Sequence, residues 1–380
     1  MPGPAGDALN ARDELKPDWG IHPGEVLATV LQRRGLRQSE LAERTGLSAK
    51  HVNQMIKQTI GISADVAILL ERALDVPADF WIKTDAAFQA YESRRRAEVA
   101  LDQYREWAGK FDKGTLRRHG VIDATDRGIT LVEKLLKLFQ VATPSAFEQT
   151  WLHPSVSFRR SQAFTVDEPN TALWLRLVER SANDLPVAPF SPRLLRKVAQ
   201  SIPAMTTMTV PNGFVAARAA LAEAGVALTF IREVPRTRVC AATWWITAER
   251  PAIGITERHR RPDIFWFNLV HELGHIVRHP RRISFLNRDD TRDSTDPAED
   301  EANAFAEETL FPGDSSQDIA LARSQHDLII IAARLGVGVP TVAGRYGNLT
   351  NNWRVASGLR ETISDEDVVA LEEIVENTPA

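Results

Sequence analysis

The feature that most constrains this chain is an apolar run, Phe265 to His275, that carries two histidines and a glutamate. The run contains the pattern H-E-x-x-H, with His271 and His275 four residues apart. Residues four apart lie on the same face of an α-helix, so both imidazoles can bind one Zn²⁺ ion. Glu272 lies beside them and can take a proton from a metal-activated water. Because the predicted helix is apolar on nearly every side, we expect it to be buried, where its polar groups need partners.

A third metal ligand is expected elsewhere in the chain, because catalytic zinc sites usually have three protein ligands. The segment from Asp296 to Pro312 predicts a helix with an apolar stripe. Glu301 borders that stripe and is the preferred third ligand, while Glu299, on the other side of the stripe, is the alternative. His279 lies one turn beyond the H-E-x-x-H pattern, but a proline follows it directly, so we interpret it as a neighbour of the site or a surface residue.

These two segments together resemble the ImmA/IrrE family of metallo-endopeptidases, which join H-E-L-G-H to a later E-A-N-x-F-A segment. Here the first motif runs from His271 to His275 and the second begins at Glu301. The resemblance covers roughly the C-terminal half of the chain and implies a gluzincin-like zinc peptidase. It also implies that His271, His275 and Glu301 are the metal ligands and that Glu272 is the catalytic base.

The composition of the whole chain sets limits on other functions. A length of 380 residues suggests two or three domains, and a hydrophobic content of 43% permits a large core. The formal net charge is only −4, so any nucleic-acid binding has to come from a local basic patch. The single cysteine, Cys240, excludes a disulfide framework and a thiolate zinc site. Since we find neither a signal-peptide pattern near Met1 nor 18 consecutive apolar residues, we expect a cytoplasmic protein.

A helix-turn-helix pattern occupies the N-terminal part of the chain. Helices are predicted at 23–34, 38–45 and 49–57, with glycines after the first two and Ser48 as a cap for the third. Residues 33–57 contain six basic and two acidic side chains, a local charge of +4. The side chains expected to contact bases and phosphates are Gln38, Lys50, His51, Asn53, Gln54 and Lys57.

Residues 21–93, which include a further predicted helix at 63–75, resemble a HigA-type antitoxin of the Xre helix-turn-helix class. The resemblance implies a dimeric operator-binding protein. It also implies that the reading positions are Gln38, Ser48, Lys50, His51 and Gln54. Stand-alone antitoxins of this type end near here, whereas this chain continues to the H-E-x-x-H pattern, and in this it departs from them.

The fold class predicted for the chain is mainly α with a small β-sheet (α+β). An all-α helix-turn-helix domain precedes a gluzincin-like zinc peptidase domain that includes three short strands and a core helix pair. We expect a polar loop at 283–297 near the mouth of the metal site. The predicted order is a tail (1–20), a helix-turn-helix domain (21–97), a connector (98–127), a helical subdomain (128–200), a metallopeptidase domain (201–350) and a C-terminal tail (351–380).

The function that this organisation favours is transcription regulation by a DNA-binding domain fused to a zinc endopeptidase. We expect the peptidase to cleave an Xre-type repressor or the chain itself in a stress or mobile-element response. His326 and Tyr346 are candidates for stabilising the oxyanion. The alternatives are a HigA-like repressor whose peptidase-like domain is a non-catalytic sensor, and an antitoxin with a neighbouring toxin. The expected partners are operator DNA, a protein substrate and a second copy of the chain.

Overall fold

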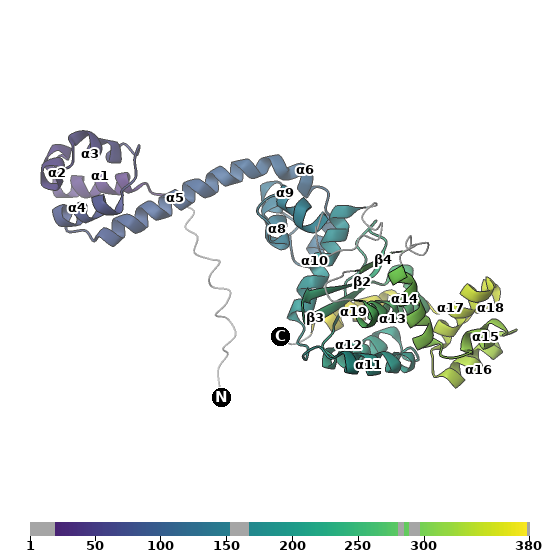
Figure 1. Cartoon of the computed structure of the whole chain (residues 1–380). Helices are drawn as coiled ribbons and strands as arrows, with labels where there is room; N and C mark the ends of the chain where they lie inside the picture. The colour runs from purple at the N-terminus through teal and green to yellow at the C-terminus, as the bar shows by residue number, and fades with distance from the viewer. Residues whose placement is uncertain (1–19, 153–166, 280–284, 289–296, 378–380) are drawn as a thin grey trace, which may run out of the picture. The chain divides into compact units, whose positions relative to one another are not determined.

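The computed structural model describes residues 20–152, 167–279, 285–288 and 297–377, and the chain divides into two compact units (Figure 1). The first unit ends at Gln103 and the second begins at Tyr104. Each unit has a hydrophobic core of its own. Nearly all of the predicted tail at 1–20 and most of the predicted loop at 283–297 lie outside the described residues.

The first unit consists of helices, and its first four confirm the helices predicted there. Left-handed glycines end the first two, since Gly35 has φ 65° and Gly46 has φ 70°. The Ser48 hydroxyl caps the third by accepting a hydrogen bond of 3.1 Å from the His51 amide. The fifth helix continues to Leu101, beyond the predicted domain end at 97. The helices are α1 (Pro23–Arg34), α2 (Gln38–Thr45), α3 (Ala49–Ile56), α4 (Ala64–Leu74) and α5 (Ala78–Leu101).

The second unit begins with helices that precede a sheet. The short helix α6 packs against α8, so the region predicted as a connector contributes to this unit. The elements are η1 (Asp102–Tyr104), α6 (Arg105–Ala108), α7 (Lys113–Arg118), α8 (Ile129–Phe139), α9 (Pro144–Phe147), η2 (Glu148–Leu152), α10 (Glu168–Asp184), α11 (Pro192–Met205) and α12 (Val210–Glu223).

A four-stranded sheet follows, with the order β1-β3-β2-β4. The three predicted strands are confirmed as β1 (Ala227–Phe230), β2 (Val239–Thr247) and β3 (Arg250–Ile255), whereas β4 (Phe285–Arg288) was not predicted. β1 pairs with β3 in parallel, and β2 is antiparallel to both β3 and β4. The observed class is therefore mainly α with a small sheet, as the sequence predicted.

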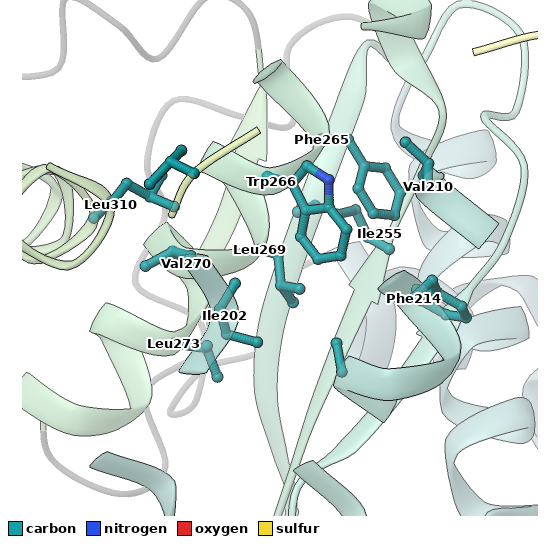
Figure 2. Packing of buried hydrophobic residues seen from close by; sticks show 14 of the residues in the cluster. Ile202, Val210, Phe214, Ile255, Phe265, Trp266, Leu269, Val270, Leu273 and Leu310 are labelled. Atoms are coloured by element: carbon teal, nitrogen blue, oxygen red, sulfur yellow. The ribbon is translucent and has the colours of Figure 1, made fainter. Parts of the chain in front are cut away.

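Helices pack on both faces of the sheet, and successive side chains of each strand point to opposite faces. On one face, Gly254 of β3 lies against Val178 of α10, and a Cβ added there would come within 2.6 Å of that valine. On the other face, Ile253 and Ile255 join a core cluster with Phe214 of α12. α12 and the helix η3 (Arg258–Arg260) precede the long helix α13 (Pro262–Arg278). α13 contributes Phe265, Trp266, Leu269, Val270 and Leu273 to this cluster (Figure 2).

The C-terminal helices complete the second unit. α17 packs against α13 and α16, which confirms the predicted core helix pair. No single helix among the described residues is long and apolar enough to span a membrane; α16 and α17 meet that test only together and are bent by 119°. The helices are α14 (Pro297–Leu310), α15 (Ser315–Ala320), α16 (Gln325–Leu335), α17 (Val339–Thr350), α18 (Trp353–Ala356) and α19 (Asp365–Glu376).

The region predicted as a C-terminal tail, 351–380, is in fact part of the core up to its last helix. α19 packs against α12 and β1, and Val368 and Leu371 are fully buried there. Arg218 of α12 donates hydrogen bonds to the Leu228 carbonyl and the Ile374 carbonyl, which ties α19 to the edge strand. The many acidic residues of α19 suggested a peripheral tail, although most of them lie on its exposed face.

Adjacent valines on α19 provide a test of this packing. Val368 is fully buried, whereas Val369 is 47% exposed. We expect Val368→Ala to lower the free energy of unfolding of the second unit by about 1–3 kcal/mol, because it leaves a cavity in the core. The matched variant Val369→Ala should change it by less than about 0.5 kcal/mol. Equal effects of the two substitutions in urea unfolding would contradict the burial of α19.

Candidate metal centre and nucleic-acid interface

Helix α13 brings the two histidines of the H-E-x-x-H pattern together in the interior of the second unit. His271 and His275 are each 2% exposed, and their Nε2 atoms lie 3.0 Å apart. For a tetrahedral zinc ion with N ligands at about 2.0 Å, two ligand nitrogens lie ~3.3 Å apart. The spacing of the two imidazoles is therefore close to that of a shared metal ion.

A close crossing of α13 and α14 brings a carboxylate to these imidazoles. Gly274, between the two histidines in the turn, lies against Ala302 of α14. A Cβ at position 274 would be 3.1 Å from the Ala302 Cα atom and 3.2 Å from its carbonyl oxygen, so a larger residue would push the helices apart. Through this crossing, Glu299 lies with its carboxylate oxygens 3.2 Å from His271 Nε2 and 3.7 Å from His275 Nε2.

The position of Glu299 corrects the preference for Glu301 as the third ligand. His271, His275 and Glu299 form a buried group whose ligand atoms all lie within 4.8 Å of one another. Glu301 is exposed and lies outside this group. The buried residues of α14 are Ala298, Glu299, Ala302, Ala306 and Leu310, whereas the stripe predicted from the sequence was Ala298, Ala302, Phe305 and Thr309, so the buried face is rotated slightly from the predicted one. That small rotation turns Glu299 toward α13 and Glu301 toward solvent.

Asn303 is a side chain at the site that was not predicted from the sequence. Its Oδ1 atom lies 2.9 Å from His271 Nδ1 and can accept the proton of that nitrogen. This hydrogen bond leaves the lone pair of Nε2 free to bind a metal, as is usual for metal-binding histidines. Asn303 follows Glu299 by four residues on α14, and that helical spacing was the available signal.

The charges at the site match a bound cation. Hydrogen bonds from both imidazoles outweigh the effect of burial and lower the pKa of Glu299 to about 2, so this carboxylate is ionised at neutral pH. Burial lowers the pKa of His275 to about 4, which leaves that imidazole neutral. For His271, burial lowers the pKa, but the hydrogen bond to Glu299 and the charges of Glu272 and Glu299 outweigh it and raise the pKa of this imidazole in the metal-free site. Zinc requires an ionised carboxylate and neutral imidazoles, so the ion has to displace the proton of His271 when it binds.

Glu272 lies beside the ligand group and is fully buried. Neither of its carboxylate oxygens has a hydrogen-bond partner within the described part of the chain. Burial raises the pKa of Glu272 to about 8, and a nearby cation would lower it again by favouring the carboxylate. The Thr243 hydroxyl of β2 donates to the Glu272 backbone carbonyl at 3.3 Å, which joins the sheet to the site. A buried carboxylate of this kind is suited to moving protons.

A cavity of about 330 Å³ opens onto the ligand group between α13, α14 and α17. His271, Glu299 and Asn303 form one side of it, and Thr341 and Arg345 of α17 form the other. The two oxyanion candidates lie elsewhere: His326 is exposed at the start of α16, and the Tyr346 side chain is buried in the core. Neither lines this cavity, so the structure does not bring them to the metal centre.

The predicted DNA-contacting residues lie on α2 and α3 of the first unit. Val52 and Met55 anchor α3 in the core and leave the opposite face of the helix accessible. Ser48 uses its hydroxyl as the cap of α3. The side chains are exposed for Gln38, Ser48, Lys50 and Lys57 and half-buried for His51, Asn53 and Gln54.

Comparison with protein families assigns both parts of the chain. Residues 27–81 match the helix-turn-helix family, and residues 228–346 match the IrrE N-terminal-like domain, the Peptidase_M78 family. The chain therefore joins an Xre-type helix-turn-helix domain to an IrrE/ImmA-type, metallopeptidase-like domain, as its motifs indicated. The Peptidase_M78 match includes His271, His275 and Glu299.

Similar individual proteins match the N-terminal part of the chain. Virulence-associated protein I of Dichelobacter nodosus is 33% identical over 69 residues, and the match covers 18% of this chain and 64% of that protein. A Pseudomonas aeruginosa protein solved with its 18-bp operator DNA is 34% identical; the match covers 20% of this chain and 82% of that chain, with a TM-score of 0.19. The antitoxin HigA of P. aeruginosa, solved with the higBA promoter, is 30% identical; the match covers 22% of this chain and 94% of that chain, with a TM-score of 0.21. The family matches, and not these partial superpositions, carry the assignment.

Metal content distinguishes the two candidate carboxylates on α14. We expect Glu299→Ala to lose most of the bound zinc, because it removes the carboxylate that lies against both imidazoles. The matched variant Glu301→Ala should keep about one zinc per chain, because that side chain is exposed. Elemental analysis of the purified proteins measures both values. Retention of zinc by Glu299→Ala together with its loss from Glu301→Ala would reverse the assignment.

Proposed function

We propose that this chain is a DNA-binding transcription regulator with a zinc-dependent endopeptidase domain. The observation that carries the proposal is the buried group of His271, His275 and Glu299 with Glu272 beside it, in a chain that also has a helix-turn-helix unit. Buried carboxylates and imidazoles in such proximity are costly unless a cation compensates them. A purely structural role for the group does not explain why Glu272 is buried without a hydrogen-bond partner among the described residues.

The residues present fit a catalytic zinc site, in which His271, His275 and Glu299 hold the ion. When bound, zinc polarises the scissile carbonyl and lowers the pKa of a water molecule. Asn303 orients the His271 ring by accepting its Nδ1 proton. Three protein ligands leave a position open for water or substrate, as catalytic sites require.

The proton transfers of peptide hydrolysis fall to Glu272. Its carboxylate takes a proton from the attacking water and then gives it to the nitrogen of the leaving amine. Burial raises the pKa of Glu272 to about 8 in the metal-free site, and a bound cation would lower it again, so the carboxylate form is available to take the first proton. The cavity beside the ligand group is lined by His271 and Glu299, so a substrate chain in it would lie next to the metal ligands.

An extended peptide is the substrate form that suits this site. β4 is an edge strand of the sheet, and it pairs with β2. Thr243 of β2 contacts the Glu272 carbonyl of α13, so this edge of the sheet lies near the metal site. A peptide that adds to such an edge through backbone hydrogen bonds is held in the extended conformation that proteolysis requires.

We propose an Xre-type repressor as the protein that is cleaved. A helix-turn-helix unit would bring the peptidase to operator DNA, where repressors of the same kind are bound, and so raise the effective concentration of the two proteins. Cleavage within this chain at 94–127 is the second possibility. Much of that segment lies in α5, α6 and α7, and helical residues have to unfold locally before they can be cut. A neighbouring repressor is therefore the preferred target.

The peptidase proposal is tested with full-length wild-type protein and Glu272→Gln, each incubated with zinc, operator DNA and the repressor encoded next to the gene. We expect the wild type to cut the repressor and Glu272→Gln to be slower by about 10²–10⁴-fold, because it lacks the general base. Both proteins should contain equal zinc. Mass spectrometry of the fragments identifies the cut. Cuts by both proteins would indicate a contaminating protease, and no cut by either would favour a non-catalytic sensor.

The DNA-binding proposal predicts a homodimer on a pseudo-palindromic operator. We expect Lys50→Ala and Gln54→Ala each to weaken discrimination between operator and random DNA by about 1–3 kcal/mol, because we propose that both side chains contact bases. Lys83→Ala, which removes an exposed lysine from α5, should leave discrimination unchanged. Fluorescence anisotropy over a salt series provides the measurement. Binding that does not weaken with salt would contradict phosphate contacts by this unit.

A further inference from the structure

A second cavity, of about 410 Å³, lies in the second unit and shares no lining residue with the cavity at the metal centre. It is bordered by α7, α10, α12, α19 and the edge strand β1. Leu177, Phe230 and Val375 supply apolar surface, while Arg118, His119 and Arg180 supply nitrogen atoms. Its volume is within the range of sites that bind small molecules. No role in the metal chemistry accounts for it.

Hydrogen bonds and an ion pair hold the elements that line this cavity together. β1 is an edge strand, and Arg218 satisfies its Leu228 carbonyl while also binding the Ile374 carbonyl of α19. Glu372 of α19 forms an ion pair with Arg232, which follows β1. These contacts use Arg218 and Arg232 to hold α19 in place. Arg118 and Arg180 remain available to bind a ligand, since they form no ion pair within the described part of the chain.

Buried polar atoms at this cavity lack partners. His119 Nε2, Arg232 Nε and Glu372 Oε1 are buried and have no hydrogen-bond partner among the described residues. Most buried polar atoms in proteins have a partner. His119 and Glu372 line the cavity, and Arg232 is paired with Glu372, so water or a ligand in the cavity would supply the missing partners. His119 is fixed by its backbone, because it ends α7 and donates its amide proton to the Thr115 carbonyl at 3.1 Å.

Positive charge surrounds the imidazole of His119. Burial, followed by the charges of Arg118, Arg180 and Arg232, lowers the pKa of His119 to about 4. An oxyanion beside His119 would be attracted by these guanidinium groups and would accept a hydrogen bond from the imidazole. Asp184 and Glu376 also line the cavity, so a ligand with several negative groups would be repelled.

We propose that this cavity binds a small molecule through a single oxyanion group, either a phosphate or a carboxylate. Arg118, Arg180 and His119 bind the oxyanion, and the apolar body of the molecule lies against Leu177, Phe230 and Val375. The site would give the regulator a binding function that is separate from its metal centre. It does not depend on peptidase activity, so its test is independent of the cleavage experiment.

The test uses the full-length chain with ¹⁵N-labelled histidine, observed by NMR, with the His119 signals assigned from a His119→Asn variant. Inorganic sulfate, inorganic phosphate and acetate are added separately at constant ionic strength maintained with chloride. We expect at least one of these anions to shift the His119 ring signals saturably toward the imidazolium position. A response to sulfate and phosphate identifies a phosphate-type site, and a response to acetate identifies a carboxylate site.

The arginines provide the decisive variants. In an Arg118→Gln/Arg180→Gln double variant, we expect the affinity for the effective anion to fall by about tenfold or more, because two charge-assisted contacts are lost. Arg193→Gln removes an exposed arginine from α11 and should leave the affinity unchanged. Both arginines of the double variant are exposed, so the variant should unfold at the wild-type temperature. No saturable shift of His119 in the wild type, or the same affinity in the double variant, would overturn the proposal.

Discussion

The crossing of α13 and α14 is the contact on which the metal centre depends. Two histidines on one helix provide half of a zinc site, and the remaining carboxylate has to come from another segment. Gly274 and Ala302 make that possible, because two small residues let the helix backbones approach closely. The approach brings Glu299 to both imidazoles and Asn303 to the back of His271. The same two helices therefore supply the candidate ligands and the side chain that orients His271.

Burial gives the site its chemistry and also makes it costly. Glu272 lies where its ionised form is disfavoured, as the rise of its pKa to about 8 indicates. The large apolar cluster around α13 offsets such a cost, since Phe265, Trp266 and Leu269 are almost fully buried beside the sheet. Active sites often combine a stable framework with a few unfavourably placed polar groups. The first unit has its own core and needs no metal to hold its DNA-binding helices.

Several elements were predictable because their signals are local. The first two helices of the first unit end at glycines, and the next two begin after capping serines. β1 and β2 contain the β-branched and aromatic residues that predicted strands. β4 and α19 were not predicted correctly. β4 is short and acquires its strand conformation by pairing with β2, and α19 was assigned to a tail because its acidic face hid its few apolar residues. In both cases a distant partner decides the outcome.

The sequence by itself determined the pair His271 and His275 and the neighbouring Glu272, because the helical repeat places residues four apart on one face whatever surrounds them. It also determined the basic third helix of the first unit. Only the tertiary structure decided between Glu299 and Glu301, because the choice depends on how α14 is rotated against α13. The cavity at β1 likewise exists only in the folded chain, since Arg118 and His119 at the end of α7 meet Arg180 of α10 through packing.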